Sequence, residues 1–155
     1  LVVRPRELFD NAIPAGSSVA ADVLQRLGRL TATPAWEQSG LTALHPVLGV
    51  LARAPTGFGH ALGAADFALS RVREVAIVGP PQAEETRTLL TKVWSTYQPN
   101  RVLAAAPADD RTAQREIPLL ADRPTLEGRP TAYVCEHFVC QLPVTDPEAL
   151  AAQLA

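Results

Sequence analysis

The sequence predicts a mixed fold, in which an α-helical segment over residues 1–72 is followed by a small α/β unit over residues 73–155. Apolar residues recur at helical spacing through the first segment. At residue 73 the pattern changes to short apolar runs rich in β-branched residues, and a helical pattern separates the first two runs. With 155 residues, of which 47% are hydrophobic, the chain is large and apolar enough to bury a core.

The first two predicted helices each begin at a recognisable cap. One starts at the N-cap offered by Gly16-Ser17-Ser18. Its apolar face consists of Val19, Ala20, Val23, Leu24, Leu27 and Leu30. The second starts at Thr33-Pro34, a hydroxyl cap followed by proline at the first helical position. Pro46 is expected to break or kink this helix after His45, because proline lacks a backbone donor and clashes one turn back.

A third helix is predicted over residues 57–70. Its apolar stripe consists of Phe58, Ala61, Leu62, Ala65 and Leu69. Three helices are few for a closed bundle, so this half is expected to expose apolar side chains. Those side chains are Val19, Leu24, Leu27, Leu62 and Leu69. Because such patches are usually covered by another chain, they predict a homodimer.

The second segment is predicted to begin with a strand, a helix and a strand, over residues 74–79, 82–96 and 101–106. The two strands should be parallel and joined by a right-handed crossover. The expected buried face of the helix consists of Leu89, Leu90, Val93, Trp94 and Tyr97. Residues 107–128 are expected to form a loop with a helical turn. A hairpin of residues 131–135 and 139–142 follows, and Thr145 and Glu148 have the spacing of a capping box for a final helix.

Two groups of residues are candidates for a site. If the hairpin turns at His137-Phe138, Cys135 lies opposite Cys140. Packed free thiols are the favoured interpretation, a structural or redox-active disulfide is the alternative, and a metal site is not expected because His137 would be only the third ligand. Asp10, Asn11 and Ser17 belong to a turn-rich loop that either lines a ligand pocket or caps the helix that follows it, and capping is favoured.

The composition argues against several classes of partner. The formal net charge of −2 without basic clusters predicts no nucleic-acid partner, and the lack of a long apolar run predicts no membrane span. The turn after residue 78 contains two prolines and two glutamates, so no nucleotide or other cofactor is expected there.

The low number of cysteines, two, and the lack of a signal peptide favour the cytoplasm as the location of the protein. A chain that begins with Leu1 and contains no Met is expected to be a piece of a longer protein.

Two stretches of the sequence resemble a known family. The first, LFDNAIPAGSSVA, runs from Leu8 to Ala20. The second, RPTAYVC, runs from Arg129 to Cys135 and is followed by Phe138, Cys140 and PVTDPE at 143–148. In order and spacing they resemble the C-terminal end of the YyaL-type proteins, the family that includes the spermatogenesis-associated thioredoxin-like proteins. Where that family has Pro-Ser-Gly-Asn-Ser, this chain has Ser17 in place of the Asn.

The resemblance implies an architecture for the parent chain. A thioredoxin-like domain would come first, followed by an α/α barrel like those of six-hairpin glycosidases and N-acylglucosamine epimerases, and then by a small α/β region. Residues 1–72 would be the last barrel helices and residues 73–155 the α/β region. The partner of this chain would then be the remainder of its parent, namely the thioredoxin-like domain and the rest of the barrel.

Three functions are compatible with this architecture. In the first, the chain is a non-catalytic C-terminal portion that completes the barrel and supports a pocket. In the second, the parent is a carbohydrate-active enzyme, glycosidase-like or epimerase-like, and Asp10, Asn11 and Ser17 lie at the barrel mouth. Sugar hydrolysis uses paired carboxylates, and Asp10 has no evident partner here, so the chain alone is expected to be inactive. In the third, Cys135 and Cys140 form a redox surface for the thioredoxin-like domain.

Overall fold

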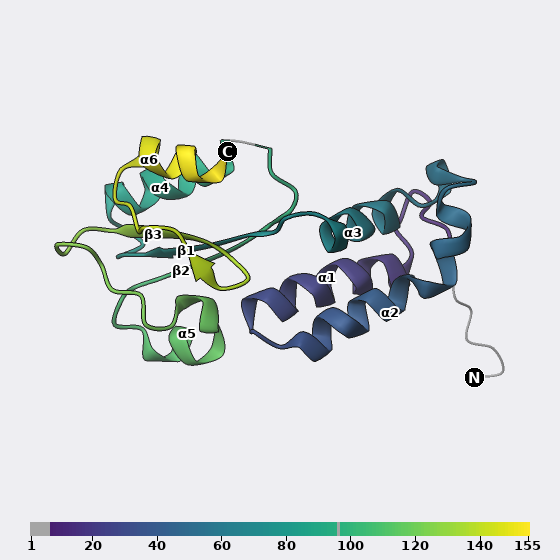
Figure 1. Ribbon diagram of the computed structural model, residues 1–155, viewed down its shortest axis with the longest axis horizontal. Helices are drawn as coiled ribbons and strands as arrows, with labels where there is room; N and C mark the ends of the chain where they lie inside the picture. Colours follow the sequence, from purple (N-terminus) through teal and green to yellow (C-terminus); the bar gives the residue numbers. More distant parts are fainter. Residues whose placement is uncertain (1–6, 96) are drawn as a thin grey trace. The chain divides into compact units, whose positions relative to one another are not determined.

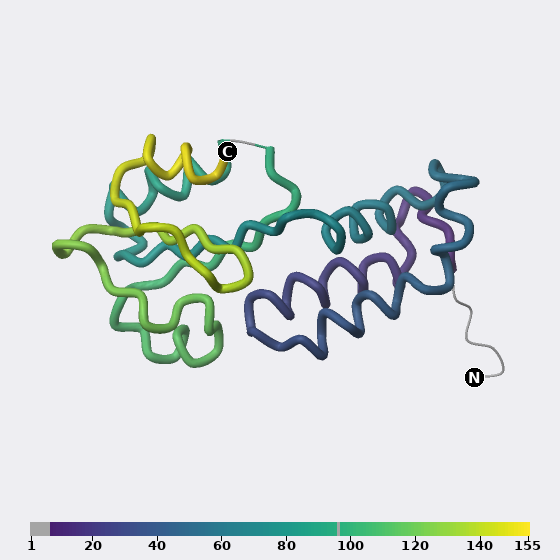
Figure 2. The backbone as a smooth tube through the Cα atoms, viewed as in Figure 1, coloured from purple at the N-terminus to yellow at the C-terminus, as the bar shows by residue number. Residues whose placement is uncertain are grey.

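The structure is a computed structural model that describes residues 7–95 and 97–155. Leu1, and Thr96 at the predicted end of a helix, lie outside the described residues. The described residues form six α-helices and a mixed four-stranded sheet, as Figures 1 and 2 show, so the predicted mixed fold is confirmed at this level. They divide into two compact units, residues 7–29 with 33–70 and residues 30–32 with 71–155.

The first unit contains three helices close to their predicted positions. They are α1 (Gly16–Leu30), α2 (Pro34–Leu51) and α3 (Gly59–Leu69), and a short 3-10 helix, η1 (Pro55–Gly57), precedes α3. Pro46 lies inside α2, so the helix does not break after His45, and of the two predicted outcomes only the kink stays open. Proline removes one hydrogen bond of the helix, and the buried Leu44 and Val47 anchor the segment on both sides. Figure 2 shows α2 changing direction beyond its middle without leaving the helix.

Helices α1 and α2 pack closely because small residues face each other. A Cβ atom on Gly40 would lie 2.8 Å from the carbonyl oxygen of Ala21, so glycine is needed for this approach. The side-chain amide of the buried Gln25 donates to the carbonyl of Ala21 at 2.9 Å and to the carbonyl of Ala64 in α3 at 3.1 Å. One buried amide therefore links α1 to α3.

The buried faces of α1 and α3 differ from the predicted apolar faces. In α1 the buried residues are Ser18, Ala21, Gln25 and Gly28, and in α3 they are Ala61, Ala64 and Phe67. Most of these buried residues are small, because close packing favours small residues at the contact and leaves larger side chains such as Val19 and Leu62 outside it. Val19 and Leu62 are exposed, and Leu69 is 87% exposed, as the incomplete helical half predicted, whereas Leu24 and Leu27 are half-buried.

The second unit is built around one sheet. Its elements are β1 (Arg73–Val78), α4 (Glu84–Trp94), β2 (Arg101–Ala106), α5 (Arg111–Glu116), the 3-10 helix η2 (Pro118–Leu120), β3 (Thr131–Glu136), β4 (Val139–Cys140) and α6 (Pro147–Leu154). The strand order is β2-β1-β3-β4. Strand β1 is parallel to β2 and antiparallel to β3, and β3 is antiparallel to β4. The chain segment that connects β1 to β2 contains α4.

Alternate residues of the strands face opposite sides of the sheet. One face packs against α4 and α6 in a single apolar core. The buried members of that core are Val75, Ile77, Leu89, Val93, Ala132, Val134, Leu150 and Leu154. Figure 1 shows α5 on the opposite side of the sheet, where Leu119 and Leu120 of η2 are buried. The face toward η2 also carries Glu74 and the β3 residue paired with it, Cys135.

Two sequence-based details of this unit are wrong. Trp94 and Tyr97 were expected on the buried face of the helix but are 65% and 90% exposed, because the buried line of α4 passes through Leu89 and Val93. The N-cap of α6 is Asp146, whose carboxylate accepts the amide of Ala149 at 2.8 Å, so Thr145 and Glu148 form no capping box. Within the described residues no helix has both the length and the apolar character needed to cross a membrane.

Candidate functional site

The carboxylate of Asp10 lies in the loop before α1 and caps two helices. Its Oδ1 accepts a hydrogen bond from the amide of Ala15, just before α1, and its Oδ2 accepts one from the amide of Ala61 in the first turn of α3, both at 2.8 Å. Burial by itself would raise the pKa of Asp10, but the hydrogen bonds from the amides of Ala61, Ala15 and His60 hold it below its ordinary value. The charged side chain is therefore a helix cap, and a ligand role for it stays a prediction.

The other two pocket candidates lie near this cap without joining it. Asn11 is exposed and Ser17 is half-buried in the first turn of α1. The amide of Asp10 donates to the carbonyl of Gly57 at 2.8 Å, which fixes the loop against the residues before α3. Among the hydrogen bonds of the described residues, none links the side chains of Asp10, Asn11 and Ser17 to one another.

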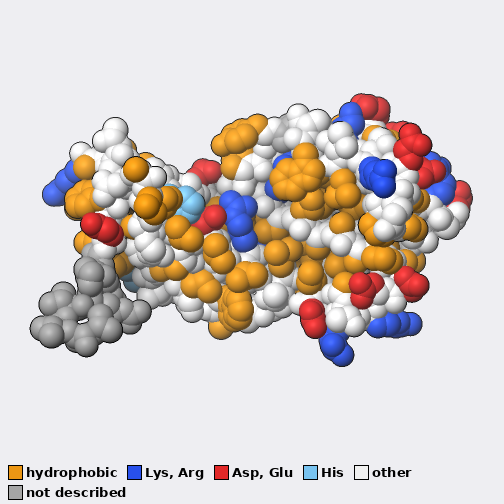
Figure 3. Space-filling model, turned by 180° about the vertical axis from the view of Figure 1, so that it is seen from behind, with side chains coloured by type: hydrophobic (Ala, Val, Ile, Leu, Met, Phe, Trp, Pro, Cys, Tyr) orange, Lys and Arg blue, Asp and Glu red, His pale blue; other side chains and the backbone are white. Residues whose placement is uncertain are grey.

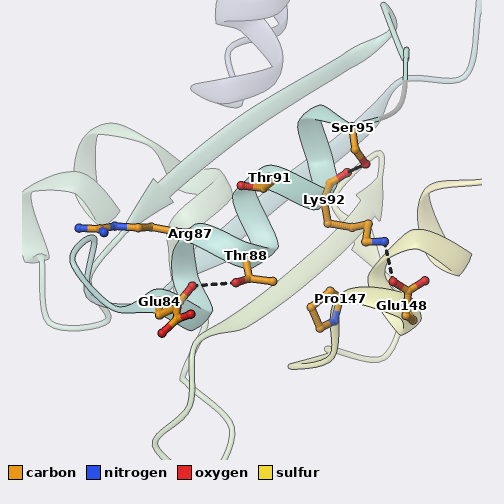
Figure 4. A pocket seen from close by; sticks show the side chains of 8 residues that line it. All are labelled: Glu84, Arg87, Thr88, Thr91, Lys92, Ser95, Pro147 and Glu148. Carbon is orange, nitrogen blue, oxygen red and sulfur yellow. Dashed lines mark hydrogen bonds and ion pairs between the residues drawn. The ribbon is translucent and has the colours of Figure 1, made fainter.

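A groove of about 500 Å³ lies between α4 and α6 (Figure 4). Its lining consists of Glu84, Arg87, Thr88, Thr91, Lys92, Ser95, Pro147 and Glu148. The Thr88 hydroxyl donates to the carbonyl of Glu84 at 2.9 Å, and the Lys92 ammonium group pairs with the Glu148 carboxylate at 2.6 Å. These polar groups bind each other within α4 or between the two helices, so they stabilise the helix pair and do not converge on one point in the groove.

The β3–β4 hairpin brings the two cysteines together as the predicted register requires. Cys135 pairs with Cys140 across the hairpin, and their Cα atoms are 3.8 Å apart. His137 and Phe138 form the two-residue turn, with φ values of +50° and +61°. The sulfur atoms form a disulfide, so the favoured interpretation of packed free thiols is wrong and the alternative holds. A two-residue turn with both φ angles positive places the flanking residues directly opposite each other.

Arg123 contacts the sulfur of Cys140. Its guanidinium Nη1 donates to Cys140 Sγ at 2.9 Å and its Nε donates to the carbonyl of Leu119 at 2.5 Å, while the group lies over the Tyr133 ring, 5.2 Å from the centroid. Burial lowers the pKa of Arg123, although the nearby Tyr133 and Glu74 act in the opposite direction. A guanidinium group held in this way is a fixed positive charge beside the disulfide.

A fully buried carboxylate lies under the same hairpin. Glu74 is 0% exposed, is the register partner of Cys135 on the neighbouring strand, and accepts the amide of Phe138 through Oε2 at 2.7 Å. A buried carboxylate requires hydrogen-bond donors. The amide of Phe138 supplies one donor from the turn itself, so the carboxylate also helps to hold the backbone in its positive-φ conformation.

A cavity of about 420 Å³ opens beside the disulfide. Its lining consists of Arg71, Arg73, Cys135, Glu136, His137, Val139, Cys140 and Gln141. Arg71 binds Glu136 with two nitrogens, and the shortest contact, Nη2 to Oε2, is 2.6 Å. Hydrogen bonding to Arg71 holds the pKa of Glu136 below its ordinary value and raises that of Arg71. In the described part of the chain, His, Cys, Asp and Glu form no group of three or more that could hold a metal ion.

Comparison with curated proteins finds one protein in three mammals. The chain is 32% identical over 148 residues to spermatogenesis-associated protein 20 of Rattus norvegicus and of Homo sapiens, and 31% identical to that of Mus musculus. The chain is homologous to this protein. In each case the match covers 95% of this chain and 19% of the relative.

The matched segment is the C-terminal part of spermatogenesis-associated protein 20. The resemblance that the two motifs carried therefore agrees with this homology, and the barrel and thioredoxin-like parts of the expected parent stay predictions. No family model matches the chain, and no solved structure matches it. The homology to spermatogenesis-associated protein 20 thus identifies a related segment and assigns no activity to it.

The sequence reasoning missed two residues of the hairpin site. Glu74 was grouped with an apolar strand, although a carboxylate inside such a run signals a buried polar partner. Arg123 lies in the long segment between β2 and β3, where the sequence contains no pattern that indicates proximity to a cysteine. Only the three-dimensional structure places it beside Cys140.

Proposed function

We propose that this chain is part of a longer protein related to spermatogenesis-associated protein 20 and is non-catalytic with respect to the pocket of that protein. Residues 1–72 would supply the last helices of an α/α barrel, residues 73–155 would be the small α/β region that follows, and the chain would support one wall of the barrel's pocket. The observation that carries this proposal is the coverage, since 95% of the chain matches only 19% of each relative. The partner of the chain would be the remainder of that longer protein.

The surface of the helical unit supports the proposal. Large apolar side chains on α1, α2 and α3 are exposed, although small residues between the helices are tightly packed. Those side chains are Val19, Val23, Trp36, Leu41, Leu48, Val50, Leu62 and Leu69. Figure 3 shows hydrophobic side chains gathered in patches between charged ones on one face of the protein. Helices in a barrel bury such faces against neighbouring helices.

The loop before α1 also fits a supporting role. Both oxygens of Asp10 bind backbone amides, so this carboxylate fixes the starts of two helices. A carboxylate used in this way is poorly suited to act as an acid or nucleophile in sugar chemistry. We therefore favour support of a pocket over a reaction carried out by these residues.

A binding experiment tests the proposal. This chain is mixed with the separately produced remainder of the same parent protein, and complex formation is followed by size-exclusion chromatography with light scattering. We expect a complex that Val23→Asp and Leu62→Asp abolish. Tyr97→Asp is the matched control, because Tyr97 is exposed in the second unit. If the chain does not bind the remainder of the parent protein and instead forms a homodimer through the same side chains, the proposal is wrong.

A further inference from the structure

We propose that Cys135 and Cys140 form a thiol–disulfide exchange site, in which Cys140 exchanges with the substrate and Cys135 resolves the intermediate. The two sulfur atoms differ in accessibility. Cys140 is half-exposed, whereas Cys135 is 2% exposed beneath the hairpin. The 420 Å³ cavity reaches the pair from solvent. An incoming sulfur atom therefore meets Cys140 first.

The charges around the pair match this division of roles. Arg123 donates to Cys140 Sγ at 2.9 Å, and a neighbouring arginine favours the thiolate form of a cysteine, which is the nucleophile in exchange. Leu119 and Tyr133 hold the guanidinium in place, so the positive charge stays beside this sulfur when the disulfide opens. The buried sulfur of Cys135 has no such contact among the hydrogen bonds of the described residues.

The reaction is balanced with a disulfide R–S–S–R′ as substrate. The Cys140 thiolate attacks one substrate sulfur, so that a bond forms between Cys140 Sγ and the sulfur of the RS group, the substrate S–S bond breaks, and R′S⁻ leaves and takes a proton from water. The Cys135 thiol then loses its proton to water, and the resulting thiolate attacks Cys140 Sγ and expels RS⁻, which takes up a proton in turn. The substrate gains two electrons and the protein dithiol loses them. A dithiol donor, through the reverse reaction, returns the protein to its reduced form.

The cavity indicates the class of substrate. Its charged lining contains two arginines against one glutamate, and Arg71 and Arg73 both contact that Glu136, at 2.6 Å and 3.4 Å. The remaining positive charge suits a disulfide that carries carboxylates, such as a small peptide disulfide. Glutathione disulfide, a peptide disulfide with several carboxylates, is therefore the probe for this site.

Trapping on single-cysteine variants tests the assignment of roles. Reduced Cys135→Ser and Cys140→Ser chains are each mixed with glutathione disulfide, and the adducts are measured by intact mass spectrometry. We expect Cys135→Ser to accumulate one glutathione on Cys140, because no resolving thiol is left. Cys140→Ser should react at least about tenfold more slowly, since a buried thiol without a cationic neighbour exchanges poorly. Equal labelling of the two variants would overturn the assignment.

A pH profile distinguishes exchange chemistry from a structural role. The charged and titratable groups around the pair are Glu74, Tyr133, Arg123, Arg71, Arg73, Glu136 and His137. In the Cys135→Ser background, Arg123→Gln should move the rise of the exchange rate to higher pH, because the thiolate of Cys140 loses its charge-assisted hydrogen bond. Arg111→Gln, on the exposed start of α5, is the control.

The wild-type chain provides the decisive measurement of turnover. Reduced wild type should convert glutathione disulfide to glutathione and end as the Cys135–Cys140 disulfide, whereas the Cys135→Ser variant should stop at the mixed disulfide between Cys140 and one glutathione. Circular dichroism checks that each variant is folded. A wild-type disulfide that excess dithiothreitol fails to open in the folded chain would refute the proposal.

Discussion

The carboxylate of Asp10 accepts a hydrogen bond of 2.8 Å from the backbone amide of Ala61, which lies 51 residues further along the chain. The other carboxylate oxygen binds the amide of Ala15. A single side chain thus accepts hydrogen bonds from backbone amides at the starts of two helices. Amides at the start of a helix have no acceptor within the helix itself and would otherwise bind water. The loop before α1 therefore stabilises the helical unit in addition to its apolar core.

Replacement of Asp10 tests that dependence. Asp10→Ala removes two hydrogen bonds to a charged group, and we expect it to lower the free energy of unfolding by about 2–3 kcal/mol. The measurement is urea unfolding followed by circular dichroism. Asn11→Ala is the matched control, because Asn11 is exposed in the same loop. Equal unfolding midpoints for the two variants would contradict the capping role.

The same residue predicts a dependence on pH. The pKa of Asp10 is lower in the folded protein than the ordinary value of 3.8. The stabilisation is therefore complete above the ordinary value and is lost as the pH falls through the lower, folded value. We expect the difference in stability between wild type and Asp10→Ala to be large at about pH 7 and to shrink steadily below about pH 4. A difference that stays constant through this range would argue against a charged cap.

The contact between α1 and α2 predicts opposite effects of two alanine substitutions in one helix. A Cβ atom at Gly40 would meet the carbonyl oxygen of Ala21 at 2.8 Å, whereas one at Gly49 would meet nothing within 4 Å. Gly40→Ala should cost about 1–3 kcal/mol because the helices must separate. Gly49→Ala should stabilise the helix by up to about 1 kcal/mol. Thermal unfolding of both variants checks the prediction, and a harmless Gly40→Ala would show that the helices separate easily.

The start of α6 provides a test of the corrected cap. Asp146 accepts the amide of Ala149, whereas Thr145 does not cap the helix. Asp146→Ala should lower the free energy of unfolding by about 1 kcal/mol. Thr145→Ala should change it by less than about 0.5 kcal/mol. Urea unfolding measures both, and the reverse order of the two effects would restore the capping box.

The ion pair beside the hairpin predicts a change in one titration. Because hydrogen bonding to Arg71 is the largest cause of the low pKa of Glu136, Arg71→Ala should raise that pKa toward its ordinary value. Arg73→Ala should raise it less, since Arg73 contacts the carboxylate at 3.4 Å. Titration of the Glu136 side-chain carboxyl by nuclear magnetic resonance provides the measurement. Equal shifts in the two variants would contradict the dominance of Arg71.

The order of helices and strands follows from the sequence, while the identity of the buried residues often does not. Hydrophobic spacing places α1 correctly but selects the large side chains of Val19 and Val23 for its buried face. The helices instead meet through Ala21 and Gly40, because small residues permit the closest approach of two backbones. Whether a helix buries its large apolar residues or its small residues depends on the helix that packs against it. The hydrophobic spacing of one helix contains no information about that neighbour.

In the candidate site, too, some features follow from the sequence and others do not. The hairpin register, with Cys135 opposite Cys140, follows from a two-residue turn and was predicted correctly. The oxidation state of the pair does not follow from spacing, because free thiols and a disulfide have the same register. Arg123 joins the site from a long segment without regular hydrophobic spacing, so its position depends on how η2 packs against the sheet.

The short β4 strand has a consequence for association with other chains. From Val139 to Val144 the chain runs along the outer side of β3, where Gln141 donates to the carbonyl of Val134 and Val144 exchanges two hydrogen bonds with Ala132. These bonds occupy the backbone groups through which an uncovered edge strand recruits a foreign strand. The disulfide fastens one end of this covering segment. Reduction would remove this link and leave the hydrogen bonds of Gln141 and Val144 to hold the covering segment on the edge of β3.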